Sequence, residues 1–249
     1  MHTKIRRTRG RSYHHGDLRR ALIETALQLV TEEQDWTFSL REVARRAGVS
    51  HRAPYNHFPE KLDLLAAVAA VGFERLRDGM VRAITGIDGA EALVVAIVRT
   101  YVRVGLENPA LYRLMFGPAL SEAGSVDRPT VARAAGAEAR AVLEEAILHG
   151  ARSAVFAVSP DSADDVALAA IAAWSAAHGL TMFAIDRIPR ADLSVDDMLD
   201  RLLRMVVTGL QQGAPNRQVG RLARRSDTAG RTSPRSSPAA SRRKKRAMK

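Results

Sequence analysis

The 249-residue chain contains no cysteine, so disulfide bonds, thiolate nucleophiles and cysteine-ligated metal sites are excluded. This composition is consistent with a reducing compartment, and we expect the protein to be cytoplasmic. The basic N-terminus is followed by no apolar run, so no secretory signal peptide is expected. Runs in which apolar and polar residues alternate, as they do in strands, are short. β-branched residues are few, whereas alanine is abundant. Helical periodicity along most of the chain predicts an all-α fold of about nine helices.

The sequence also lacks the short motifs of several enzyme classes. It has no phosphate-binding P-loop, no G-x-G-x-x-G and no G-x-S-x-G. His14, His15 and Asp17 are the group that most suggests a metal site. Adjacent histidines rarely converge on one ion, however, and no third histidine follows at ligand spacing. We therefore predict that the protein is not an enzyme and holds no metal or cofactor.

Acidic charge is scarce at both ends of the chain. Residues 1–20 carry a net charge of +6 and residues 216–249 a net charge of +11, while the segment between them sums to −6. Residues 1–12 form an arginine-rich arm and residues 216–249 an Arg/Ser/Pro/Gly-rich tail, both of which we expect to be disordered. This distribution predicts a polyanionic partner, although charge alone does not separate DNA from RNA or an anionic membrane.

One segment is long and apolar enough to require a membrane test. No Asp, Glu, Lys or Arg occurs between Val166 and Ile185, which meets the minimum length of a span. Eight of these 20 residues are alanine, and Asp164, Asp165 and Asp186 bracket the segment without a cluster of Lys or Arg. We predict a helix buried in a protein core or interface, and no membrane partner.

Residues 39–61 have the pattern of a helix-turn-helix. Ser39 and Glu42 have the spacing of a capping box, and apolar residues at helical spacing follow them. Gly48 suits a turn with positive φ, and Ser50 suits the N-cap of a second helix. Pro54 would lie in or just after the first turn of that helix, where a missing N–H costs little. A helix-turn-helix places its second helix in the major groove of DNA.

The second helix carries side chains suited to reading bases. Arg52 and Asn56 are four residues apart and share a face. Arginine matches the acceptor edge of guanine, and asparagine matches adenine. A solvated amphipathic hairpin without any DNA role would show the same spacing.

The segment from Tyr13 to Leu62 resembles the DNA-binding domain of the tetracycline-repressor-like (TetR) family of bacterial transcription regulators. The likeness runs from Tyr-His-His-Gly-Asp-Leu-Arg at its start to Ala-Pro-Tyr-Asn-His-Phe-Pro-Glu-Lys-Leu at its end. It implies a helix-turn-helix domain over residues 13–61, buttressed by a first helix over about 17–32. Phosphate contacts would come from Ser39, Tyr55, His57 and Lys61, and base contacts from Ser50, His51, Arg52 and Asn56.

A long helix from near residue 59 to about 85 is expected to join this head to a helical body over residues 62–215. At 1.5 Å per residue it would span about 40 Å. Further helices are expected over about 90–107, from Asn108, over about 129–149, over about 161–184 after Ser159 and Pro160, and from Ser194 to Gly213. The last two, rich in small or apolar residues, are candidates for a dimer interface.

Within the body, Trp174-Ser-Ala-Ala-His178-Gly179 resembles the Trp-x-x-x-His-Gly (WHG) signature of one class of TetR-like C-terminal domains. That resemblance implies a homodimer through the last two helices and an effector pocket in the body. Its candidate lining residues are Tyr101, Tyr112, Met115, Phe116, Trp174, His178 and Met182. The plainer alternative is that these residues are ordinary core and that His178 is a hydrogen-bonded interior histidine. Arg99, Arg103, Glu107 and Arg113 either favour an anionic ligand or are solvated.

Together these features predict a sequence-specific DNA-binding transcription regulator, with repression as its expected action. An unknown small-molecule effector would release it from a palindromic operator on double-stranded DNA. An activator would use the same head. A further alternative is a nonspecific architectural nucleic-acid-binding protein driven by its basic tails.

Overall fold

The computed structural model describes residues 15–121, 131–188 and 193–213. All regular elements among these residues are helical, which confirms the predicted all-α fold. The arginine-rich arm and the basic tail fall outside the described residues, so their predicted disorder is not tested.

The N-terminal head is built from α1 (His15–Glu33), α2 (Leu40–Arg46) and the short 3₁₀-helix η1 (Ala53–Asn56). Its core contains Leu22, Leu29, Val43 and Phe58, all of which are buried. The Ser39 hydroxyl accepts the Glu42 backbone N–H at 3.2 Å and so caps α2, as expected. The Glu42 carboxylate does not complete the predicted capping box, because it pairs with Arg45 instead.

The second helix of the helix-turn-helix differs from the prediction. We expected a helix capped by Ser50, but the regular segment is the 3₁₀-helix η1, with Arg52 at its N-cap. Backbone bonds here run from residue i+3 to residue i, with Ala53 N–H donating to Ser50 and Tyr55 N–H to Arg52. Pro54 supplies no N–H and restricts the residue before it, which favours this tighter, shorter geometry. Gly48 does take the expected positive φ, at 69°.

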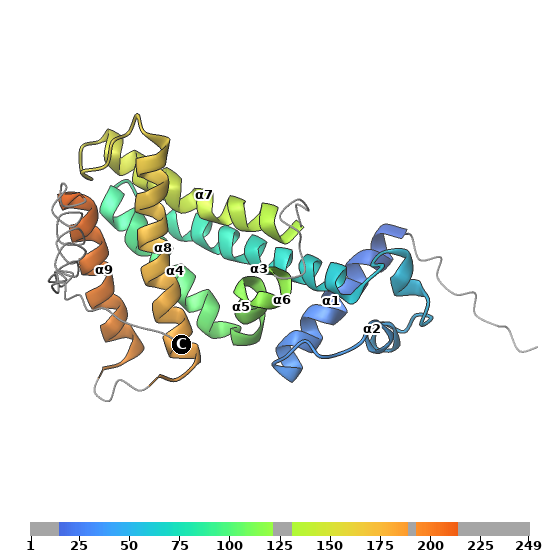
Figure 1. Ribbon diagram of the computed structural model, residues 1–249. Helices are drawn as coiled ribbons and strands as arrows, with labels where there is room; N and C mark the ends of the chain where they lie inside the picture. The colour runs from blue at the N-terminus through green and yellow to red at the C-terminus, as the bar shows by residue number, and fades with distance from the viewer. Residues whose placement is uncertain (1–14, 122–130, 189–192, 214–249) are drawn as a thin grey trace, which may run out of the picture. The chain divides into compact units, whose positions relative to one another are not determined.

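α3 (Lys61–Ile84) is the long connecting helix, and it begins two residues later than predicted. The side chains of Glu60 and Asp63 form a reciprocal capping box at its start. Residues 64–70 are buried on every side of the helix. The reason is that α3 packs against α1 of the head and also against three helices of the body described below, α4, α5 and α7. The same helix therefore contributes to the cores of both head and body (Figure 1).

The body helices are α4 (Ala90–Glu107), α5 (Pro109–Phe116), α6 (Pro118–Ser121), α7 (Val131–Arg152), α8 (Ala163–Ile185) and α9 (Val195–Gln212). α3 packs on α7 and α4, α8 on α4 and α7, and α9 on α8 and α4 (Figure 1). α8 begins after Ser162 rather than after Ser159, because the Ser162 hydroxyl accepts the Asp165 N–H.

α8 leaves an apolar face uncovered within the described chain. By length and composition alone it could cross a bilayer, and only 28% of its most apolar window is buried. Leu168, Ile171 and Phe183 are exposed on it, Phe183 by 58%. On α9, Met205 is 76% exposed. The segment predicted to be buried is thus only partly covered by its own chain.

Candidate functional site

The predicted base-reading residues lie in one short exposed segment. Ser50, His51, Arg52 and Asn56 are all exposed, and Tyr55 is 47% exposed. Pro54 and Phe58, in contrast, are buried and hold the segment to the head. Polar side chains therefore face outward along η1 while apolar side chains anchor it, which is the arrangement that groove recognition requires.

The predicted phosphate-contacting residues outside this segment have other neighbours as well. The exposed Ser39 hydroxyl is engaged in capping α2. The Lys61 ammonium lies 5.3 Å from the centre of the Phe38 ring. Burial lowers the pKa of Lys61, and the nearby Asp35 carboxylate partly opposes this effect. His57 is only half-buried. None of these positions excludes a phosphate contact, and their roles stay predictions.

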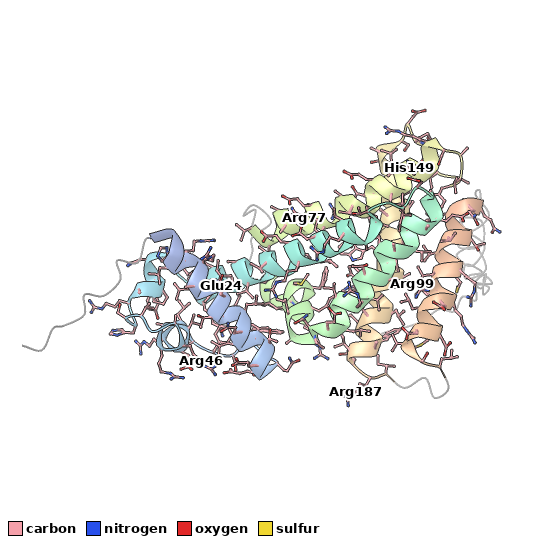
Figure 2. All side chains as sticks on the ribbon, turned by 180° about the vertical axis from the view of Figure 1, so that it is seen from behind. Glu24, Arg46, Arg77, Arg99, His149 and Arg187 are labelled. Carbon is pink, nitrogen blue, oxygen red and sulfur yellow. The ribbon has the colours of Figure 1, made fainter. Side chains whose placement is uncertain are left out.

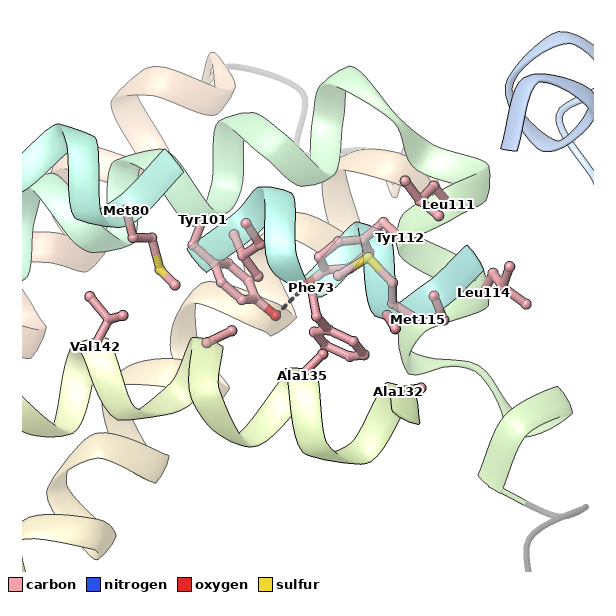
Figure 3. Packing of buried hydrophobic residues seen from close by; sticks show 14 of the residues in the cluster. Phe73, Met80, Tyr101, Leu111, Tyr112, Leu114, Met115, Ala132, Ala135 and Val142 are labelled. Carbon is pink, nitrogen blue, oxygen red and sulfur yellow. Dashed lines mark hydrogen bonds between the residues drawn. The ribbon is translucent and has the colours of Figure 1, made fainter. Parts of the chain in front are cut away.

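A polar cluster lies inside the body where α4, α5 and α8 meet. The Tyr112 hydroxyl lies 2.6 Å from His178 Nδ1 and donates to the Tyr101 hydroxyl at 2.8 Å. Trp174 Nε1 donates to the same Tyr101 hydroxyl at 2.8 Å. Figure 3 shows Tyr101 with a dashed bond from its hydroxyl toward Tyr112. Trp174 and His178 are one helical turn apart, so both reach Tyr101 from one face of α8.

Burial keeps this cluster uncharged. Desolvation raises the pKa of Tyr101 to about 12, and it also raises the pKa of Tyr112. Desolvation lowers the pKa of His178 below its usual value. At neutral pH the tyrosines are therefore protonated, and the neutral state of the histidine is favoured. The cluster forms a neutral hydrogen-bond network.

A narrow apolar cavity of about 30 Å³ lies beside the cluster. Its walls come from α3, α4, α5, α7 and α8 and include Phe73, Tyr101, Phe116 and Trp174. Figure 3 shows Phe73, Met80 and Tyr101 from this region among the packed side chains. A space of this size holds about one water molecule.

A second, wider cavity of about 310 Å³ shares one wall with the first. We call the 30 Å³ space the inner cavity and the 310 Å³ space the outer cavity. Both are lined by Phe73, Phe116, Gly136, Arg140 and Trp174. The outer cavity alone falls in the size range of small-molecule sites.

The structure brings most of the predicted pocket residues together, but not all to the cavities. Tyr101 lines the inner cavity, Met115 the outer cavity, and Phe116 and Trp174 line both. Tyr112 and His178 line neither cavity and lie 2.6 Å apart in the polar cluster, where His178 is half-buried and hydrogen-bonded. Met182 is partly buried against the core and lines neither of these two cavities.

Sequence reasoning missed the contribution of α7. Arg140 lines both cavities, yet its ion pair with Glu144, four residues on, resembles an ordinary solvated helix face in the sequence. Gly136 faces the Phe73 ring, where an added Cβ would lie 3.4 Å from the ring carbons. An arginine and a glycine four residues apart on one side of a helix give no specific sequence signal.

The charged residues of α4 and α5 are engaged elsewhere. Arg99 pairs with Asp200 at 2.5 Å, Arg113 with Asp186 at 2.5 Å and Arg103 with Glu107 at 2.9 Å. Figure 2 labels Arg99 on α4. These ion pairs are exposed. The charged side chains of α4 and α5 are therefore solvated, as one of the two sequence-based alternatives described.

His14 lies outside the described residues, and within the described part no group of three potential metal-ligating side chains occurs.

Two family models match the chain. Residues 22–68 match the model of bacterial regulatory proteins of the tetR family, and residues 94–206 match a tetracyclin repressor-like C-terminal domain. The first covers most of α1, the helix-turn-helix and the start of α3, and the second covers most of the body. No curated protein matches the chain.

Solved structures share the fold along most of the chain. A protein of unknown function from Rhodococcus sp. RHA1 is 29% identical, with a TM-score of 0.67, over 81% of this chain and 100% of its own. A tetR-family regulatory protein from Rhodococcus RHA1 is 18% identical, with a TM-score of 0.58, over 78% of this chain and 96% of its own. RolR in complex with resorcinol is 21% identical, with a TM-score of 0.57, over 90% of this chain and 99% of its own.

Proposed function

Because the chain belongs to the TetR family of bacterial transcription regulators, we propose that it is a cytoplasmic homodimeric repressor released from its operator by a small molecule. DNA binding and regulation are properties of the family. Beyond these family properties, we propose that the chain represses, that it has an operator and an effector, and that particular residues carry each role.

The observation that carries the proposal is the outward-facing polar segment at η1. Arg52 and Asn56 are exposed, while Pro54 and Phe58 fix the segment to the head core. Arg52 would read a guanine edge and Asn56 an adenine edge, with Ser50 and His51 beside them. Ser39, Tyr55, His57 and Lys61 would contact phosphates and set the register.

The uncovered apolar face of α8 and α9 supports a dimer. Leu168, Ile171 and Phe183 on α8 and Met205 on α9 expose apolar surface that a second copy would bury. A four-helix bundle made from α8 and α9 of two chains would hide it. A two-fold dimer would present two reading segments one turn of DNA apart, about 34 Å, and so require a palindromic operator.

The outer cavity in the body supports effector release. RolR, which shares the fold, holds resorcinol, and the outer cavity here, at about 310 Å³, is of a size for a comparably small molecule. A ligand between α3, α5, α7 and α8 would act on helices that also contact α1 of the head, namely α3 and α5. Such a ligand shifts the protein only if it binds the DNA-free arrangement more tightly than the DNA-bound one.

Selection of bound fragments from a pool of random duplexes tests the proposal directly. We expect an inverted repeat whose half-sites lie about one turn apart. Recovery of fragments without any shared sequence would favour the nonspecific architectural alternative instead.

A second version of this experiment uses a chain that lacks residues 217–249. Twelve of the basic residues are removed with this tail, so we expect affinity to depend less steeply on salt while the selected sequence stays the same. Loss of the selected sequence with the tail would contradict the division of roles between tail and head. A reporter gene behind the selected site then distinguishes repression from activation.

A further inference from the structure

We propose that Arg19 of α1 is a further DNA-contacting residue, which binds a phosphate of the duplex backbone and is positioned for this by the ring of Phe58. This proposal rests on the proposed function, because it extends the DNA-binding surface of the head beyond the residues that the sequence indicated. Arg19 is exposed, and it is not among the predicted phosphate contacts.

The guanidinium of Arg19 lies next to the segment that carries the base-reading side chains. Its Cζ is 5.4 Å from the centre of the Phe58 ring. Phe58 is buried, and its backbone N–H donates to the carbonyl oxygen of Pro54 in η1 at 2.9 Å. Phe58 thus connects Arg19 of α1 to η1. The major groove is about 12 Å wide, so when η1 lies in it, the phosphates that border the groove come within reach of an arginine held beside η1.

Arg19 differs from its neighbour Arg20 in having no acidic partner. Arg20 forms an ion pair with Glu24 at 3.5 Å, and Arg45 and Arg46 of α2 pair with glutamates as well. Among the described residues no carboxylate pairs with Arg19, whose partner is an uncharged aromatic ring. A phosphate at Arg19 would therefore meet a full positive charge, whereas a phosphate at Arg20 would compete with Glu24.

The contact with Phe58 holds the Arg19 side chain without neutralising its charge. A cation over the face of an aromatic ring is attracted by the ring quadrupole and remains a cation. The five N–H donors of a guanidinium form a planar fork that matches the oxygens of a phosphate, and Arg19 donates none of them to an oxygen of the described residues. Because the ring already restricts the side chain, less conformational freedom is lost when a phosphate binds.

The head repeats this arrangement at a residue that the sequence does indicate as a phosphate contact. The Lys61 ammonium lies 5.3 Å from the centre of the buried Phe38 ring. Phe38 directly precedes Ser39, which is a second predicted phosphate contact. Two cations of the head, one on α1 and one at the start of α3, are thus each placed over a ring of the head core. This recurrence supports a shared role for them at the DNA backbone.

The salt dependence of DNA binding tests the proposal. The full chain and its Arg19→Gln variant are titrated by fluorescence anisotropy against the selected inverted repeat and against a random duplex of equal length, between about 50 and 200 mM salt. Loss of one phosphate contact should make the slope of log K against log salt shallower by about 0.9 for each chain bound. At any one salt concentration both duplexes should lose affinity by the same factor, because a phosphate carries no sequence information.

Arg20→Gln is the matched control, because it removes the same charge from the next residue, an exposed arginine that is paired with Glu24. It should leave the slope close to that of the unaltered chain. Arg19→Lys keeps the charge and should restore most of the slope. The proposal is overturned if Arg19→Gln leaves the slope unchanged, if Arg20→Gln changes it as much, or if Arg19→Lys fails to restore it.

A purely structural role of Arg19 gives a different result. If Arg19 only supports Phe58 and η1, Arg19→Gln would weaken binding to the inverted repeat more than to the random duplex and leave the salt slope as it is, which also overturns the proposal. Sequence-selective binding by the unaltered chain together with any of these contrary results would reject the role of Arg19 and leave the regulator proposal standing. Absence of duplex binding by the unaltered chain would instead reject the regulator proposal itself, and the role of Arg19 with it.

Discussion

The Tyr112 hydroxyl lies 2.6 Å from Nδ1 of His178, and this contact joins α5 to α8 inside the body. Tyr101 of α4 completes the junction, because its hydroxyl is 3.1 Å from the same nitrogen. Three helices are thereby held at one buried point next to the candidate ligand cavity.

Tyr112→Phe removes the hydroxyl but keeps the ring. The change leaves His178 Nδ1 and the Tyr101 hydroxyl with one partner fewer in a part-buried setting. We expect the free energy of unfolding to fall by about 1 to 3 kcal/mol, measured by urea denaturation. Tyr55→Phe is the control, because Tyr55 is exposed, and it should change stability by less than about 0.5 kcal/mol. Equal effects of the two variants would mean that the buried network adds no stability.

Stability should depend on pH through His178. Burial lowers the pKa of His178 in the folded chain below its usual 6.5. The unfolded chain then binds a proton more readily, so the free energy of unfolding falls as pH drops below about 6.5 toward the folded-state pKa. His178→Gln should flatten the dependence in this window, relative to the unaltered chain and to His51→Gln, which alters an exposed histidine. Urea denaturation between pH 5 and 8 measures both slopes, and an unchanged slope in His178→Gln would contradict the assignment.

Arg52→Ala and Asn56→Ala should each weaken binding to the selected operator by about 1 to 3 kcal/mol and relax specificity at one base position. The physical reason is the loss of hydrogen bonds to base edges from an exposed part of the head. Anisotropy titrations with operator and with random duplex of equal length measure the effect. An equal loss on both duplexes would show that these side chains touch only the backbone. Arg103→Ala, in the body, is the control and should change neither affinity.

Phe183→Asp should convert the dimer to monomers and with it abolish tight operator binding. The substitution places a charge on an apolar face that we propose a second chain covers, where an unpaired carboxylate is costly. Sedimentation at micromolar concentration reports the assembly state. Val81→Asp is the control, because Val81 is similarly exposed but lies on α3. A dimer that survives Phe183→Asp would move the interface away from this end of α8.

The fold was largely predictable because helices have local signals. Ser39, Ser194 and Asn108 mark helix starts within a residue of where they occur, and the apolar periodicity gave the all-α class. The errors in the predicted helices also have local causes. Pro54 changed a predicted α-helix into a 3₁₀ turn. The start of α8 moved to Ser162 because the hydroxyl of this serine accepts the Asp165 N–H.

The site was less predictable because its parts come from distant segments. The family resemblance led to Tyr101, Phe116 and Trp174, which do line the cavities. Arg140 and Phe73 come together with them only when α3 packs on α7. In the sequence, Arg140 has the pattern of a surface arginine with an acidic residue nearby, and Phe73 is one of the apolar residues at helical spacing along α3. Nothing in their local pattern indicates a cavity.

The burial of residues 64–70 all around α3 has a practical consequence for protein engineering. The DNA-reading portion cannot be cut from this protein as an independent module, because a fragment ending at residue 61 would lose the helix against which α1 packs. A fragment that kept α3 would instead expose the apolar surface normally hidden by α5 and α7. Chimeras that swap sensing bodies between regulators should therefore be joined beyond residue 70, with the matching contacts of α5 carried along.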